Sequence, residues 1–387
     1  MRYFYGQYNG EEFPTPEKLF GFDQLMEFIL LHGDQALDAR QQLMEDNEKD
    51  SQIIDKMIEE GLLEKDGQGK LRLTPRAVNR MQIKALNEIF QNMRQGLRDG
   101  HTSTAPGTGG ERLEETRPYQ YGAPIHELDL NQTLRNALQR QGLPVRNEEG
   151  RFRIRFKERD FELHQQEGVT SCSTVVLLDM SGSMMRFGRF LAAKKVAMAM
   201  QQLVHSRFPQ DTIDFVGFYS GAVQIPPIAL PLIMPKPVTI FDYSVRMRVP
   251  IAQLDQAPQH FTNLHMGLQL ARRILKRRGG ENRQMLIITD GQPTAHVEGD
   301  FVYLIYPPDK RSSIATLKEA HLATREGCRI ATFALIEDYW GMDWVTFVEQ
   351  MNRLTKGIAF YTSAVELAGC IVESYLTGRK KKSYVGH

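Results

Sequence analysis

The second half of the chain alternates between short apolar runs and stretches with helical spacing. Residues 173–178, 284–289 and 329–335 contain apolar runs rich in β-branched residues, a pattern typical of strands buried on both faces of a parallel sheet. Between these runs, stretches such as 190–204 and 264–275 repeat apolar residues at the spacing of amphipathic helices. The alternation predicts an α/β fold with a doubly wound, mostly parallel sheet.

The first hundred residues are mainly helical in pattern, with one predicted hairpin. Residues 62–73 form two short alternating runs around Asp66 and Gly67, which is typical of a β-hairpin. Thr74 and Pro75 then provide the N-cap and first residue of another helix. Helices followed by a hairpin and a further helix resemble a winged-helix domain. We therefore predict a mainly helical, winged-helix-like N-terminal domain over residues 1–99.

The rest of the chain divides by composition. Residues 100–127 are rich in Gly, Thr, Ser and Pro, which predicts a flexible linker. Residues 128–169 contain a helical stretch and the alternating basic strand 151–156, and we interpret them as a connecting segment. The α/β domain is expected over residues 170–378, followed by a basic tail at 379–387.

Oxygen-bearing side chains follow the apolar run 173–178. Asp179 ends this run, and Ser181 and Ser183 come at the next alternate positions. Open α/β sheets bind their ligands at the carboxyl ends of strands, and a carboxylate with two hydroxyls suits a hard cation that keeps some of its water, such as Mg²⁺. Further along the chain, Thr262 precedes a predicted helix and Asp290 ends another apolar run.

This ordered set resembles the metal-ion-dependent adhesion site of von Willebrand factor A-type (vWA) domains, which have a Rossmann-like fold. The resemblance covers about residues 170–378. It implies that Mg²⁺, with Mn²⁺ or Ca²⁺ as alternatives, is held at one site and that an Asp or Glu of a partner protein completes the coordination. The implied metal residues are Asp179, Ser181, Ser183, Thr262 and Asp290. The chain departs from the family pattern at His260 and Phe261, where glycines are common, and in the long segment 226–259 beside the site.

The resemblance extends to proteins that work with MoxR-type or magnesium-chelatase-type AAA+ ATPases. It implies an adaptor that links such an ATPase to a client during complex maturation or metal insertion. The alternative hypothesis is a nucleic-acid-associated factor, in which the winged-helix-like region binds DNA or RNA and the vWA domain recruits protein. Residues 70–98 are basic, but residues 1–66 are acidic, so we do not expect nucleic-acid binding.

Enzyme motifs are missing from the sequence. A phosphatase of the haloacid-dehalogenase type would need Asp in place of Ser181, and a serine hydrolase would need a Gly-x-Ser-x-Gly elbow. The glycine-rich residues 105–111 lack the Gly-Lys-Ser/Thr ending of a phosphate loop. We therefore predict neither catalytic residues nor an organic cofactor, and we do not expect His265 to be a metal ligand.

Composition agrees with a cytoplasmic protein. The chain has 387 residues and a net charge of +1. Cys172, Cys328 and Cys370 are widely spaced and are expected to be reduced thiols. The sequence shows no signal peptide and no apolar run long enough to span a bilayer, so membrane insertion is not expected.

Overall fold

In a computed structural model, the chain divides into two units: residues 1–97 together with 172–387, and residues 98–171. The structure describes residues 22–38, 48–93, 112–119, 128–142, 154, 156–166, 171–280, 282–336, 342–364 and 366–379. None of the helices in these ranges is both long and apolar enough to cross a membrane.

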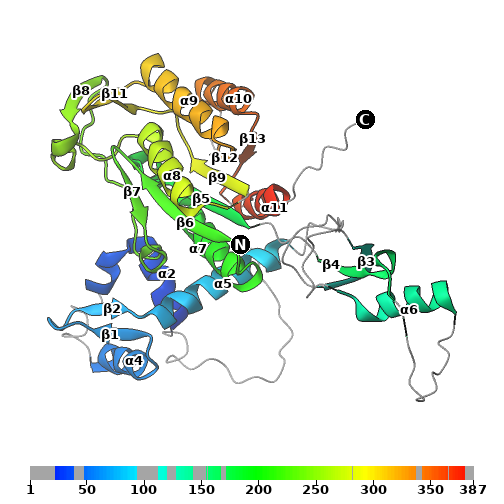
Figure 1. The fold of residues 1–387 in the computed structure, drawn as a ribbon. Coiled ribbons are helices and arrows are strands. Elements are labelled where there is room, and N and C mark those ends of the chain that lie inside the picture. Colours follow the sequence, from blue (N-terminus) through cyan, green and yellow to red (C-terminus); the bar gives the residue numbers. More distant parts are fainter. Residues whose placement is uncertain are drawn as a thin grey trace, which may run out of the picture. The chain divides into compact units, whose positions relative to one another are not determined.

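A six-stranded sheet forms the centre of the larger unit (Figure 1). Its strand order is β13-β12-β9-β5-β6-β7, with β7 antiparallel to β6 and every other pair parallel. The strands are β5 (Cys172–Asp179), β6 (Thr212–Phe218), β7 (Ala222–Ile225), β9 (Asn282–Thr289), β12 (Cys328–Leu335) and β13 (Ile358–Thr362). The chain runs outward from β5 in one direction to β6 and in the other to β9, so the topological switch point lies between β5 and β9. The predicted doubly wound, mostly parallel sheet is confirmed.

Helices cover both faces of this sheet. On one face, Val176 and Leu178 of β5 belong to the same apolar core as α7 (Arg189–Arg207) and α11 (Leu367–Arg379). On the other face, Val175 and Leu177 pack in a second core with α8 (Leu264–Arg278), α9 (Lys310–Arg325) and α10 (Met342–Thr355). Because successive side chains of a strand point to opposite faces, a continuous apolar run was needed to bury β5 on both sides.

The N-terminal region is mainly helical, as predicted. It contains α2 (Phe22–His32), α4 (Glu48–Glu59), β1 (Leu63–Lys65), β2 (Leu71–Leu73) and α5 (Pro75–Met93). The predicted hairpin is confirmed, since β1 and β2 pair antiparallel. The Ala77 amide donates to the Thr74 hydroxyl over 3.2 Å, which caps α5 at the predicted residue. Apolar residues of this region share one core with α7.

A buried lysine on α7 ties the N-terminal region to the segment after β7. Lys194 is fully buried, and its Nζ donates to the carbonyl of Leu30 over 2.8 Å and to that of Pro231 over 3.1 Å. Burial lowers the pKa of Lys194 to about 7. Nearby, Gly33 has φ +61°, and a Cβ there would lie 2.5 Å from the Leu232 carbonyl oxygen. Only glycine fits this contact.

A smaller antiparallel sheet is built partly from the 226–259 segment. Its order is β10-β11-β8, with β8 (Val245–Pro250), β10 (Ala295–Glu298) and β11 (Phe301–Tyr306). Val245, Val302 and Leu304 contribute to a separate small core, and Figure 1 shows β8 and β11 apart from the central sheet.

The second unit contains β3 (Arg112–Pro118), α6 (Leu130–Gln141) and β4 (Glu162–Gln166). β3 lies within residues 100–127, which were expected to form a flexible linker, and there it pairs antiparallel with β4. The charged sequence of β3 has no alternating apolar pattern, so its strand depends on a partner far along the chain. Asp160 is buried and accepts hydrogen bonds from Arg140 Nε and Nη2 over 2.9 and 2.7 Å. Most of the predicted strand 151–156 and the tail 380–387 lie outside the described residues.

Candidate metal centre

The candidate site lies where β5 and β9 end side by side. Leu178 of β5 pairs with Ile288 of β9 in parallel register. Asp179 is the last residue of β5, and Asp290 follows β9 directly. The two carboxylates therefore reach the same edge of the sheet at its switch point, which is the usual ligand position in an open α/β sheet.

Hydrogen bonds join the predicted side chains into one cluster. The Ser181 amide donates to Asp179 Oδ1 over 2.8 Å, and the Thr289 hydroxyl donates to Asp179 Oδ2. The Ser181 and Ser183 hydroxyl oxygens lie 3.1 Å apart. The Ser183 hydroxyl then donates to Asp290 Oδ1 over 2.7 Å. We call Asp179, Ser181, Ser183 and Asp290 the acidic cluster.

Thr262 is held beside this cluster through its main chain. The Gly182 amide donates to the His260 carbonyl over 3.0 Å, so the loop before Thr262 contacts the serine loop although it lacks the glycines common in the family. Thr262 is buried; its amide donates to the Thr294 hydroxyl, and its carbonyl accepts from the amides of Thr294 and Ala295. Among the described residues, its own hydroxyl makes no hydrogen bond with the acidic cluster.

Arg189 was not identified from the sequence, although it contacts the cluster directly. Its Nη1 donates to Asp290 Oδ2 over 2.8 Å, and the side chains of Arg189 and Asp290 are 10% and 0% exposed. The only sequence signal was its position at the start of the helix that follows the serine loop. The guanidinium supplies one positive charge to the cluster and fixes Asp290 so that Oδ1 faces Ser183.

Two buried carboxylates of like charge make this edge favourable for a cation. The pKa of Asp179 is raised, first by complete burial and second by the charge of Asp290. No group of three or more His, Cys, Asp or Glu side chains is placed to hold a metal in the part of the chain that the structure describes. A cation here would therefore rely on hydroxyl oxygens as well as the carboxylates. Hard oxygens of this kind fit Mg²⁺.

An apolar rim borders the cluster. The Lys236 amide donates to the Met180 carbonyl over 2.8 Å, and Val238 packs so closely on Gly182 that a Cβ there would lie 2.5 Å away. The same segment carries Phe241, which is 83% exposed, and Phe187 of the serine loop is 61% exposed. Exposed aromatic residues beside a polar site are typical of protein-binding surfaces.

A second polar group, also not identified from the sequence, resembles a catalytic triad. His296 Nδ1 lies 2.9 Å from the Ser312 hydroxyl, and His296 Nε2 lies 3.2 Å from Glu298 Oε1. In a serine hydrolase the nucleophile faces the substrate and the acid is buried. Here Ser312 is fully buried, whereas the Glu298 side chain is 57% exposed. The group joins β10 to α9 and offers no accessible nucleophile.

The chain matches two domains of one protein family. The family described as Rv0959-like protein, vWA domain, matches residues 172–376, and the family described as Rv0959-like protein, third domain, matches residues 111–166. Protein Rv0959 of Mycobacterium tuberculosis (strain ATCC 25618 / H37Rv) and protein Mb0984 of Mycobacterium bovis are each 30% identical to this chain over 334 residues. These residues are 84% of this chain and 44% of each relative, so the chain spans less than half of their length.

Solved structures with a similar fold include domains of bacterial pili. The vWF domain of the type V pili tip protein Mfa5 from Porphyromonas gingivalis is 14% identical, with 56% of this chain and 99% of that chain covered and a TM-score of 0.38. The PilB minor pilin from Streptococcus sanguinis is 14% identical, with 59% and 66% covered and a TM-score of 0.40. This likeness concerns the fold alone. On the match to residues 172–376, the chain belongs to the vWA domain family of Rv0959-like proteins.

Proposed function

We propose that this chain is a Mg²⁺-dependent protein-interaction module that captures an acidic residue of a partner protein. One observation carries the proposal: the hydrogen-bonded acidic cluster at the switch point of the sheet, with Asp179 and Asp290 brought together from adjacent strand ends. A vWA domain suggests a role in protein interaction. The bound Mg²⁺ and the carboxylate of the partner are what we propose beyond this general role.

The residues of the cluster would divide the work of holding the ion. Ser181, Ser183 and Thr262 offer neutral oxygens, and Asp179 and Asp290 compensate the charge. When bound, Mg²⁺ supplies an electrophilic centre for an anionic oxygen of the partner. Asp290 is held by Arg189 and Ser183, and Asp179 by Thr289 and the Ser181 amide. The carboxylates are thus oriented by the protein itself, and the apolar rim would exclude water around the contact.

The partner class follows from the resemblance to proteins that act with MoxR-type AAA+ ATPases. On that basis we propose that the chain links such an ATPase to a client during complex maturation or metal insertion. No catalysis by this chain is part of the proposal, because the acidic cluster has no nucleophile paired with a base and Ser312 is buried.

The test compares partner capture with and without divalent cation. The purified chain, Asp179→Ala and Ser181→Ala are immobilised and exposed to a lysate of the source cells in Mg²⁺ or in chelator, and the bound proteins are identified. Wild type should retain specific proteins only in Mg²⁺, and both variants should lose them. Ser206→Ala, on α7 away from the cluster, is the matched control. Mg²⁺-independent capture, or capture by Asp179→Ala equal to that by wild type, contradicts the proposal.

The same proteins are then compared by thermal melting in chelator. The sheet is built from apolar strands that need no ion, so the variants should melt close to wild type, in contrast to small domains whose core is a metal. A large fall in melting temperature without metal would mean that the cluster serves folding instead.

A further inference from the structure

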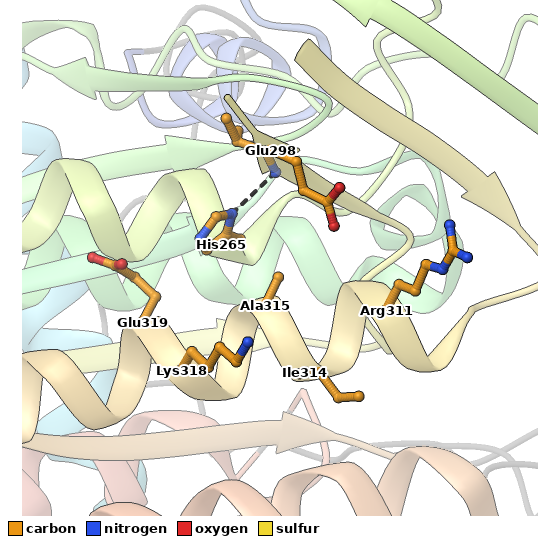
Figure 2. Close-up of a pocket in the computed structure, with 8 residues that line it drawn as sticks. His265, Glu298, Arg311, Ile314, Ala315, Lys318 and Glu319 are labelled. Atoms are coloured by element: carbon orange, nitrogen blue, oxygen red, sulfur yellow. Dashed lines mark hydrogen bonds between the residues drawn. The ribbon is translucent and has the colours of Figure 1, made fainter. Parts of the chain in front are cut away.

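A pocket of about 310 Å³ lies between β10 and α9 and is not part of the acidic cluster (Figure 2). His265 and Glu298 line one side of it, and Arg311, Ile314 and Lys318 of α9 line the other. Figure 2 shows the charged ends of Arg311 and Lys318 reaching toward this space from α9. The pocket is thus a mixed site, with charged groups at its sides and an apolar contact from Ile314.

The pocket adjoins the candidate metal centre through His265. This residue is in the first turn of α8 and follows Thr262 by three positions. Its Nδ1 accepts from the Val297 amide over 3.0 Å, which joins α8 to β10 at the pocket wall. Burial lowers the pKa of His265 to about 4, so the imidazole is neutral at pH 7. The Thr262 carbonyl accepts from the amide of Ala295, the first residue of β10, and Val297 and Glu298 of the same strand line the pocket. Because a strand advances about 3.3 Å per residue, the pocket begins close to Thr262.

The acidic side chains of the pocket already have partners. Glu298 Oε1 lies 3.2 Å from His296 Nε2. Arg272 Nε lies 2.9 Å from Glu319 Oε1, and Figure 2 shows Glu319 at the opposite end of the pocket from Arg311.

The basic side chains differ. Across the described ranges, neither the Arg311 guanidinium nor the Lys318 ammonium forms an ion pair with a carboxylate. Both residues lie on α9 seven positions apart, which places them on the same face, two turns from each other. Two cations without counter-ions, facing a partly enclosed space, favour an anionic ligand.

We propose that this pocket binds a carboxylate side chain of an acidic peptide segment, through Arg311 and Lys318. The link to the metal centre rests on the proposed function: one acidic residue of the segment reaches the ion, and a second one enters the pocket. An extended peptide advances about 3.3 Å per residue, so an acidic residue two to four positions away spans the distance from Thr262 to the pocket. Ile314 offers a contact for the methylene groups of a glutamate.

The probe is a fluorescein-labelled hexaglutamate peptide, with its binding to the full chain followed by fluorescence anisotropy in Mg²⁺. Replacing both cations, Arg311→Ala with Lys318→Ala, should weaken binding by about tenfold, the loss expected for two partly exposed charge-assisted contacts. The control pair Lys310→Ala with Arg325→Ala removes the same charge from exposed positions of the same helix. It should bind like wild type. Equal weakening by both pairs would reveal nonspecific attraction and overturn the proposal.

A variant that is expected to bind hexaglutamate more tightly provides a second test, because damage to the fold would not increase the affinity. Glu298→Gln removes an exposed negative charge from the wall of the pocket but keeps an acceptor for His296, so it should tighten hexaglutamate binding about threefold. No tightening, or no binding of hexaglutamate to wild type, counts against the pocket.

Chelator separates this proposal from the proposed function. Chelator and Ser181→Ala weaken hexaglutamate binding if the metal centre holds the peptide. If they do so and the Arg311→Ala, Lys318→Ala double variant has no effect, the result supports the metal centre and refutes the pocket. Binding that ignores chelator but is lost in the Arg311 and Lys318 pair supports the pocket and refutes the metal centre as the anchor.

Discussion

Two of the places where the larger unit buries ionisable groups differ in how those groups are compensated. Lys194 is a single charge inside the molecule, and main-chain carbonyls of Leu30 and Pro231 accept its hydrogen bonds. Asp179 and Asp290 are two like charges at the edge of the sheet, and their partners are mostly hydroxyl groups and Arg189. Arg189 and Lys194 lie in the same helix, α7.

The difference indicates what each place is for. Carbonyls from separate segments fix Lys194 completely, so its role is to hold those segments together. The acidic cluster carries more negative charge than Arg189 can compensate, and its hydroxyls can rotate toward a new ligand. A buried charged group whose hydrogen bonds are all satisfied by the protein has a structural role. Buried charge that the protein does not compensate, at the end of a strand, indicates a ligand site.

The largest effect is expected from Asp179→Asn. The amide is nearly isosteric with the carboxylate and keeps an acceptor for the Ser181 amide, but it removes the repulsion with Asp290. Without metal, the variant should be as stable as wild type or more stable. We expect Mg²⁺ to raise the melting temperature of wild type, and this rise should be absent in the variant. A variant that still gains stability from Mg²⁺ would place the ion elsewhere.

Arg189→Met tests how the cluster is balanced. The change leaves buried Asp290 without its guanidinium, so in chelator the free energy of unfolding should fall by about 3 kcal/mol. Because the remaining cluster is more negative, Mg²⁺ should restore more stability than it adds to wild type. Urea unfolding in Mg²⁺ and in chelator measures both quantities. An equal loss under both conditions would mean that Arg189 acts only in packing.

Lys194→Met should change the pH dependence of stability. The pKa of Lys194 is about 7 in the folded chain, whereas the ordinary lysine value of 10.5 applies to the unfolded chain. The unfolded chain therefore binds the proton more tightly. The buried ammonium therefore lowers the free energy of unfolding by its full amount below pH 7. This destabilisation decreases as the pH rises and is gone at about pH 10.5. Wild type should gain up to about 1.4 kcal/mol per pH unit in this window relative to Lys194→Met.

A neighbouring lysine serves as the control for this slope. Lys195 lies 3.1 Å from Glu88 in a partly exposed ion pair. Lys195→Met should keep the pH dependence of wild type when urea midpoints are compared at pH 7, 8 and 9. If both variants have the same slope, the amine of Lys194 is not the source.

Local patterns were sufficient to predict the parts of the fold that depend on neighbours in sequence. The apolar run before Asp179 predicted a strand buried on both faces, and the cap at Thr74 predicted the start of α5. The Asp-Gly turn predicted the β1–β2 hairpin. Each of these features is determined by periodicity or by hydrogen bonds over a few residues, which a sequence displays directly.

The features that the sequence did not predict depend on contacts between distant segments. Lys194 has the sequence context of an ordinary helical lysine, and only the approach of α2 and Pro231 buries it. Arg189 pairs with a carboxylate 101 positions away. β3 has no strand pattern of its own and needs β4 as its partner. The metal residues stay a prediction, although hydrogen bonds join the side chains of Asp179, Ser181, Ser183 and Asp290 at one edge of the sheet.

Because α7 and the N-terminal helices share one apolar core, the vWA domain is not expected to fold without those helices. The family match begins at residue 172, but Leu30 lies outside it and accepts a hydrogen bond from Lys194. A fragment cut at that boundary would expose the apolar side of α7 that now shares a core with α5. It would also leave a buried amine without one of its acceptors. Such an excised domain should aggregate or melt early, so the smallest independently folding version of this vWA domain includes the N-terminal helices α2 and α5, which lie far before it in the sequence.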